Sequence, residues 1–134
     1  MNGGVMLAVL RIVSGLLFLE HGLQKITGFP APLDPSRMPP LNTLPGMAGF
    51  IELGCGLLIA LGLFTRPAAF LASGTMAVAY FYQHAPQNLF PVNNQGDAAI
   101  LYCFVFLYLV FAGAGPLSID AARANRTSSP PPQD

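Results

Sequence analysis

The chain has 134 residues, of which 53% are hydrophobic and only 9% are charged. A soluble domain usually carries about 25% charged residues. This composition therefore excludes a soluble protein whose whole surface is polar and exposed to water. The net charge is zero, which disfavours binding to nucleic acid. Two cysteines, Cys55 and Cys103, are too few for a disulfide scaffold or a four-cysteine metal site.

Four apolar stretches approach the length of about 20 helical residues that crosses a bilayer. They are residues 5–24, 46–64, 68–84 and 97–115. One such stretch also fits the buried helix of a soluble protein, but four in succession leave no amphipathic helix to cover them. The first lacks a basic leader and a small-residue cleavage site, so we expect a retained helix and not a signal peptide.

The connecting segments predict turns and loops. Residues 27–45 contain six prolines and cannot form a continuous helix. Residues 65–67 predict a tight turn, with Pro67 opening the next helix, and residues 85–96 predict a second loop on the side of the first. We therefore expect an all-α fold, in which residues 1–120 form an up-down-up-down four-helix transmembrane bundle and residues 121–134 a disordered cytoplasmic tail.

Basic residues indicate the orientation in the membrane. Arg66, Arg123 and Arg126 flank the spans at one end, whereas Lys25 and Arg37 lie at the other. Because cytoplasmic loops carry an excess of Lys and Arg, both termini are expected in the cytoplasm. Arg11, within the first span near this end, is expected to snorkel or to cap a cytoplasmic carboxylate.

The other ionisable side chains near or within the spans gather in the outer third of the bundle, where each needs a partner or a function. They are Glu20, His21 and Lys25 at the end of the first span, Glu52 in the second, His84 in the third and Asp97 at the start of the fourth. Glu52 shares a helical stripe with Gly49, Gly56 and Ala60. Since small residues mark close helix packing in membranes, Glu52 is expected to point inward.

This cluster has two interpretations. In the first, Glu20 and Glu52 approach each other and form a coupled unit with His21 or His84, which creates a polar pocket with a proton-accepting group near neutrality. In the second, Glu52 with Lys25, or Glu20 with a histidine, forms an ion pair that only fixes helix packing. The sequence leaves both open.

No metal site is predicted, because His21, His84, Glu20 and Glu52 have suitable donors but no local ligand motif. Cys55 and Cys103 are expected to act as small hydrophobes, with a redox pair as the alternative. Six aromatic residues either fill the core or flank a flat ring such as a quinone: Phe18, Phe81, Tyr82, Phe104, Phe106 and Tyr108. The sequence contains no nucleotide-binding loop, nucleophile elbow or zinc protease motif.

Several segments in order resemble the DoxX family of small bacterial membrane proteins. They are LRIVSGLLFLEHGLQKITGF, AGFIELGCGLLIALGLFTRPAAF, YFYQH followed by NLFPVNNQGDAAILY, and GAGPLSID. The resemblance covers about residues 5–120. It implies a four-helix bundle in the bacterial cytoplasmic membrane and an accessory role in quinone- or thiol-linked redox systems. It supplies no catalytic residues.

The leading hypothesis is therefore an accessory subunit of a membrane redox system, with a polar pocket near the outer face and a quinone as candidate cofactor. Its expected partners are the lipid bilayer and other membrane redox proteins, or further copies of itself; whether it is an enzyme stays open. The alternative is a non-catalytic scaffold or assembly subunit. A small-solute or proton carrier is less favoured, because four helices enclose little volume without oligomerisation.

Overall fold

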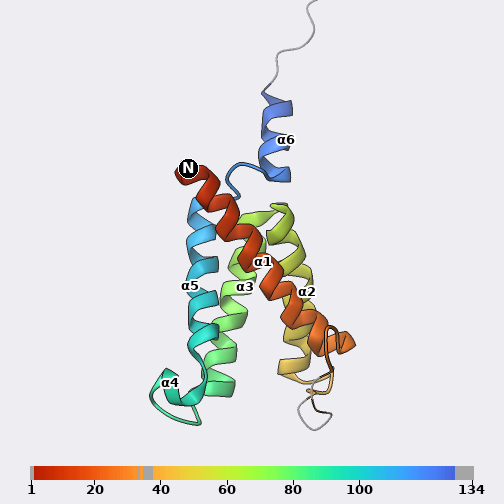
Figure 1. Ribbon diagram of the computed structural model, residues 1–134, viewed down its shortest axis with the longest axis vertical. Helices are drawn as coiled ribbons and strands as arrows, with labels where there is room; N and C mark the ends of the chain where they lie inside the picture. Colours follow the sequence, from red (N-terminus) through yellow and green to blue (C-terminus); the bar gives the residue numbers. More distant parts are fainter. Residues whose placement is uncertain (1, 33, 35–37, 129–134) are drawn as a thin grey trace, which may run out of the picture.

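The computed structural model describes residues 2–32, 34 and 38–128. These residues form six α-helices and one π-helix, with no strand among them (Figure 1). The four longest helices are α1 (Gly3–Thr27), α2 (Leu44–Leu61), α3 (Thr65–Ala79) and α5 (Asp97–Ala112). The π-helix η2 (Tyr80–His84) continues α3, and α4 (Pro91–Asn94) and α6 (Ile119–Thr127) are short. The predicted all-α fold class is thus confirmed.

Polar caps and glycines set the helix ends. The Asn2 side chain accepts a hydrogen bond from the Val5 amide at the start of α1, and Thr43 accepts one from the Gly46 amide at the start of α2. Gly62 adopts a left-handed conformation (φ 67°) and ends α2 after Leu61. The turn before α3 therefore occupies residues 62–64, and residues 65–67, which were expected to form it, already belong to α3.

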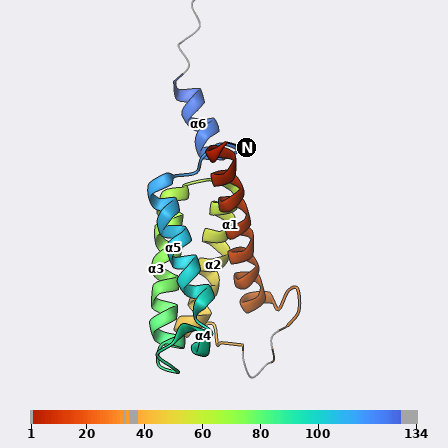
Figure 2. The same cartoon turned by 60° about the vertical axis from the view of Figure 1, so that its left-hand side comes forward.

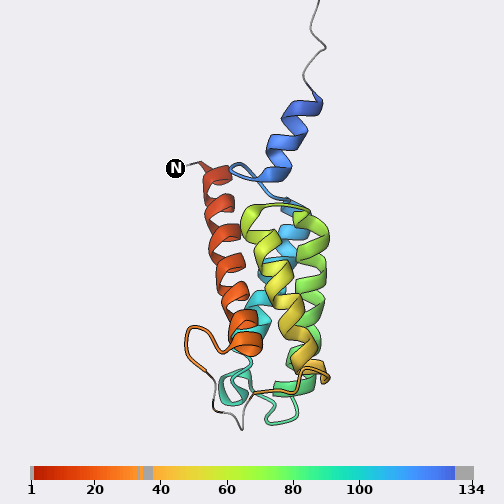
Figure 3. The ribbon, with the colours of Figure 1, turned by 90° about the vertical axis from the view of Figure 1, so that its right-hand side faces the viewer.

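The long helices are arranged as two pairs. α1 packs along α2, and α3 packs along α5, whereas α2 meets α3 less extensively and α1 has few contacts with α5. The pairs are joined at the short connection between α2 and α3, which Figure 3 shows at the same end as α6. We call this the closed end. At the opposite end, which carries α4 and is called the wide end, the pairs diverge (Figure 1).

Glycines bring the backbones of α1 and α2 into contact. A Cβ atom on Gly22 would lie 2.5 Å from the Leu53 nitrogen, and one on Gly56 would lie 2.5 Å from the Leu19 nitrogen. No side chain fits between the helices at these positions. The stripe of small residues on α2 therefore faces α1, as the sequence predicts.

The second pair uses small residues of α3 against large residues of α5. Ala69 and Ala72 are fully buried opposite a core that includes Phe106 and Leu109. Phe18 reaches into this core from α1, with its ring centroid 4.7 Å from that of Phe106 in an edge-to-face arrangement. Of the six aromatic residues singled out in the sequence, these two fill the core, and the other four are exposed.

The outward faces of the long helices carry large exposed apolar side chains, among them Leu16, Phe50, Phe70 and Phe111. By length and composition, α1 and α2 each suffice to cross a membrane. α5 is equally apolar but has 16 residues.

A buried arginine fastens the closed end. The Arg11 side chain is fully buried and donates hydrogen bonds to four carbonyls: Ile59 (2.8 Å), Ala60 (2.6 Å), Ala114 (2.8 Å) and Leu117 (2.8 Å). Two of these carbonyls lie in the last turn of α2, where carbonyls lack donors from a following turn. Ile59 also accepts a hydrogen bond from the Gly62 amide at 3.1 Å. Arg11 was expected to snorkel or to cap a carboxylate; instead it binds main-chain oxygens of two separate segments.

Asp120 adds a second fastening at this end. Its carboxylate accepts hydrogen bonds from the Phe64 and Thr65 amides, both at 3.0 Å, and so caps the start of α3. Burial opposes ionisation of Asp120, but these amides and the positive charge of Arg123 outweigh it and lower the pKa of the carboxyl.

The segment after Asp120 differs from its expected disorder. Ser118 caps α6 by accepting a hydrogen bond from the Ala121 amide at 3.1 Å, with Asp120 in the first turn. Residues 121–127 are consequently helical. The expected tail residues 129–134 and Arg37 lie outside the described residues. α6 and the start of α1 are at the same end of the molecule (Figure 2).

Candidate ligand cleft

A cavity of about 1140 Å³ lies between the two helix pairs, toward the wide end. All four long helices line it, together with η2 and the loop residues Met38, Pro39 and Pro40. Its walls are mainly apolar and include Phe18, Ile51, Phe70, Met76 and Ala99. We refer to this cavity as the cleft.

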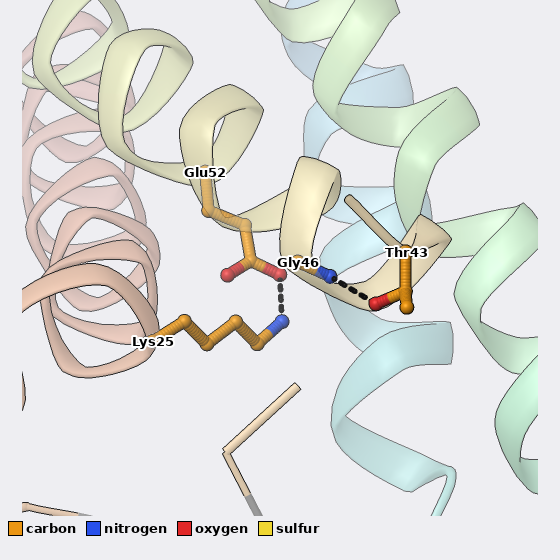
Figure 4. A network of polar contacts seen from close by, with 4 residues as sticks. All are labelled: Lys25, Thr43, Gly46 and Glu52. Carbon is orange, nitrogen blue, oxygen red and sulfur yellow. Dashed lines mark hydrogen bonds and ion pairs between the residues drawn. The ribbon is translucent and has the colours of Figure 1, made fainter. Parts of the chain in front are cut away.

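An ion pair forms part of the cleft wall. The Lys25 ammonium lies 2.6 Å from Glu52 Oε1 and joins α1 to α2 (Figure 4). The Glu52 side chain is only 2% exposed, whereas that of Lys25 is 27% exposed. The ion pair between Glu52 and Lys25, one of the two interpretations of the sequence, is therefore present.

The second carboxylate oxygen of Glu52 has no such partner. Glu52 Oε2 is buried and has no hydrogen-bond partner among the described residues. Figure 4 shows only the other oxygen joined to Lys25. An unsatisfied acceptor costs about 1–3 kcal/mol when it is buried, and more when it is charged. The cleft wall thus has unused capacity to accept a hydrogen bond.

His21 and Tyr102 extend the polar side of the cleft. The His21 ring meets the Tyr102 ring edge-on at 5.9 Å, and Tyr102 stacks on Phe106 at 5.6 Å. His21 is exposed overall, yet it lines the cleft with Tyr102. Tyr102 is not among the pocket residues predicted from the sequence. Its position one helical turn before the core residue Phe106 is the signal that places both on one face.

His84 lines the cleft at the end of η2. The Ala85 amide donates to the Tyr80 carbonyl at 2.9 Å, a bond across five residues that defines the π-turn; such turns are frequent at functional sites. His84 Nδ1 lies 2.9 Å from the Asn94 carbonyl oxygen. Since a carbonyl only accepts, Nδ1 is the donor in this contact, and in the corresponding tautomer of imidazole Nε2 is an acceptor.

The buried Asn94, which is not among the residues predicted from the sequence, organises the loop beside His84. Its side chain donates to the Asn88 carbonyl at 2.9 Å and accepts from the Gly96 amide at 2.8 Å. The available signal was the local sequence Asn94-Gln95-Gly96, since asparagine side chains bond amides two residues ahead in turns.

The structure does not bring two of the expected pocket residues into the cleft. Glu20 and Asp97 are both exposed, and neither lines it in the described part of the chain. The expected approach of Glu20 to Glu52 is replaced by the pair of Glu52 with Lys25. Asp97 shares the outward face of α5 with Phe104 and Tyr108, both exposed. Because α5 is apolar all round, hydrophobic periodicity does not indicate its inner face.

Cys55 and Cys103 are free thiols, the first buried and the second half-buried. Ser73 donates to the Cys103 carbonyl at 2.8 Å, and its hydroxyl lies 3.5 Å from the Cys103 sulfur. In residues 2–32, 34 and 38–128, no group of three His, Cys, Asp or Glu side chains is placed to hold a metal ion.

Comparison with known proteins connects this architecture to a family. The DoxX family model matches residues 6–85. An uncharacterized protein of Haemophilus influenzae is 42% identical over 117 residues, which cover 85% of this chain and 87% of that protein. A second uncharacterized protein of the same organism is 31% identical over 128 residues, 89% of this chain and 83% of the relative.

The uncharacterized membrane protein Rv3486 of Mycobacterium tuberculosis is 38% identical over 65 residues, 45% of this chain and 39% of that protein. No solved structure matches. The family match spans α1, α2, α3 and η2, and so includes Lys25, Glu52 and His84. The chain belongs to the DoxX family of membrane proteins.

Proposed function

We propose that residues 1–120 form a multi-pass domain in a bacterial cytoplasmic membrane, in which α1, α2, α3 with η2, and α5 all span the bilayer. The exposed apolar side chains on these helices support this arrangement. Arg66, Arg123 and Arg126 belong to the closed end, which favours a cytoplasmic position for α6 and the start of α1.

The proposed topology makes a direct prediction. Reporters fused after Arg126 and inserted between Pro39 and Pro40 should lie on opposite sides of the membrane. A phosphatase and a fluorescent protein, each active on one side only, distinguish the two locations. Signals from the same side would contradict the arrangement.

We further infer that the protein is an accessory subunit of a quinone- or thiol-linked membrane redox system, and that its cleft binds the ring of a quinone-class molecule. The observation that carries this proposal is the Lys25–Glu52 pair in the wall of an otherwise mainly apolar cavity. Small-molecule sites characteristically combine apolar walls with a few converging polar groups. Partner redox proteins or further copies of the chain would dock on the outward apolar faces.

The residues present fit such a ring. Lys25 uses one N–H for Glu52 and retains two, which can bind a carbonyl oxygen of the ring. Phe18 and Tyr102 supply flat apolar faces, and His84 Nε2 is a further acceptor in the wall. A bound quinone would supply reversible two-electron chemistry; the chain's part is to orient the ring and to keep it away from water.

Quinone binding is tested with the protein in lipid nanodiscs and the short-chain analogue decylubiquinone. The chain has four tyrosines and no tryptophan. Tyr82 and Tyr102 line the cleft, so quenching of tyrosine fluorescence reports a ring close to either of them. The double variant Lys25→Met/Glu52→Met should bind at least about tenfold more weakly, because charge-assisted hydrogen bonds are lost. Glu20→Gln alters an exposed carboxylate on the same helix as Lys25 and should bind like the wild type. Equal binding by all three proteins would contradict the proposal.

A scaffold without a ligand is the second candidate, because the same ion pair also ties α1 to α2. Replacing a buried ion pair by apolar residues of similar size is often neutral or stabilising. If the pair serves a ligand, the double variant should melt near the wild-type temperature and lose only quinone binding. If the pair serves packing alone, its removal should leave quinone quenching unchanged, whatever the melting temperature.

A further inference from the structure

We infer that the cleft selects ligands whose head group donates a hydrogen bond to the carboxylate of Glu52. The head group is a neutral hydroxyl on an apolar ring or chain. This inference rests on the proposed ligand cleft and specifies the chemical form that the cleft takes. For a quinone-class molecule, it assigns the reduced, hydroxyl-bearing form.

Glu52 has an unused hydrogen-bond acceptor. Lys25 occupies Glu52 Oε1, and the buried Oε2 has no partner among the described residues. The two oxygens are chemically equivalent and exchange by rotation about the Cγ–Cδ bond. The carboxylate therefore has the capacity to accept one more hydrogen bond, and buried polar groups rarely stay unpaired. Additional carbonyl groups could not satisfy it, because a carbonyl only accepts.

The charge balance of the ion pair favours a neutral head group. The ammonium of Lys25 already balances the carboxylate of Glu52. A cationic head would leave one positive charge uncompensated between the helices, and an anionic head would add a negative charge beside Glu52. Uncompensated charges cost several kcal/mol within a membrane. A neutral hydroxyl meets the hydrogen-bonding requirement without changing the charge of the site.

The shape of the cleft favours a ligand with an apolar tail. Leu44 begins α2 at the wide end, and Glu52 lies eight residues further along the helix. At the helical rise, Glu52 is therefore about 12 Å from that end of α2. Phe70, Leu71 and Val78 line the cleft, and all three are more than a third exposed on the outward surface of α3. The apolar wall thus continues from the buried ion pair to the surface that faces lipid in the proposed topology. A ligand with a hydroxyl head and an apolar tail fits this gradient, with its head at Glu52.

A matched pair of probes isolates the donor. 4-Hexylphenol carries a hydroxyl group, and 4-hexylanisole carries the same ring and chain with that hydroxyl methylated. Binding to the nanodisc-embedded full chain is measured by calorimetry, with empty nanodiscs correcting for partition into lipid. The wild type should bind the phenol about tenfold or more tightly than the ether, since hydrogen bonds to charged groups have this strength.

Two variants locate the effect. Lys25→Met/Glu52→Met should bind both probes with equal affinity, and Glu20→Gln should retain the wild-type preference. Equal affinity of the wild type for both probes, or a preference that persists in the double variant, would overturn the inference. Failure of both probes to bind the wild type would overturn it as well.

These outcomes are separable from those for quinone binding. If decylubiquinone fails to bind but the phenol preference depends on Glu52, the quinone assignment fails and donor selection stands. If decylubiquinone binds and neither probe is preferred, the proposed function stands and donor selection fails.

Discussion

Each end of the molecule buries a charged side chain, but the two charges have different surroundings. At the closed end, the guanidinium of Arg11 donates to four main-chain carbonyls and lies between two chain segments. At the wide end, the carboxylate of Glu52 has one partner, one unused oxygen and a cavity beside it. The difference teaches that burial of a charge does not by itself indicate a ligand site. The guanidinium of Arg11 is taken up by the fold, whereas the unused oxygen of Glu52 beside the cleft is the feature on which the proposed ligand site rests.

The same comparison explains why the cleft lies where it does. The closed end fixes α2 to the segment that follows α5, through Arg11, and fixes α3 to α6, through Asp120. Glycine contacts hold α1 against α2, and small residues of α3 pack against α5. Because each pair is tight and the pairs are fastened at one end, the space between them opens at the other.

The largest predicted loss of stability follows Arg11→Met. The variant removes the Arg11 donors from Ala60 at the end of α2 and from Ala114 and Leu117 after α5, at an expected cost of about 3 kcal/mol or more. Thermal unfolding in detergent measures the loss. Arg11→Lys keeps the charge but not the planar fork, so its loss should be intermediate. A wild-type melting temperature for Arg11→Met would show that this network does not fasten the closed end.

Gly56→Leu should have the next largest effect. A side chain at Gly56 collides with the backbone of Leu19 and must separate α1 from α2, which should cost about 2 kcal/mol or more. Gly54 provides the matched control, because a Cβ atom there has nothing within 4 Å. Gly54→Leu should stay within about 0.5 kcal/mol of the wild type or gain slightly from helix propensity. Equal melting temperatures for the two variants would mean that the glycine face does not hold the pair together.

Asp120→Asn should have the smallest effect, and that effect should depend on pH. The variant keeps one acceptor oxygen but loses the second acceptor and the charge, which is expected to cost about 1 kcal/mol or less at neutral pH. The folded-state pKa is below the ordinary value of about 3.9. The carboxylate therefore contributes stability above about pH 4, and this contribution is lost as the pH falls through the folded-state pKa. Melting temperatures of wild type and variant should converge as the pH falls through this lowered pKa; a constant difference would contradict the cap.

Helix positions were largely predictable from the sequence, because long apolar stretches between proline-rich or glycine-containing segments predict them. The inward position of Glu52 was also predictable, since Gly49 and Gly56 share its stripe and glycines favour close helix packing. Lys25 was a candidate partner of Glu52, because it lies near the end of the preceding helix at a similar depth in the membrane.

Other features depend on how helices cross, which the sequence pattern does not specify. Arg11 meets carbonyls from residues 48 to 106 positions away, and no local motif indicates that convergence. Glu20 is adjacent to His21, yet the packing of α1 leaves its carboxylate exposed and outside the cleft. Tyr102 was not predicted because α5 is apolar on all sides. Its hydrophobic pattern therefore does not distinguish the face that packs inward from a face that contacts lipid.

The most direct test of the contrast between the two ends is the melting temperature of three proteins with and without saturating 4-hexylphenol. The proteins are the wild type, Arg11→Met and Lys25→Met/Glu52→Met. A ligand that binds only the folded state raises its stability. We predict that Arg11→Met melts at a lower temperature but keeps the ligand-induced rise, whereas the double variant melts near the wild type and loses the rise. A rise of equal size in the double variant, or none in the wild type, would contradict the assignment of the wide end to ligand binding.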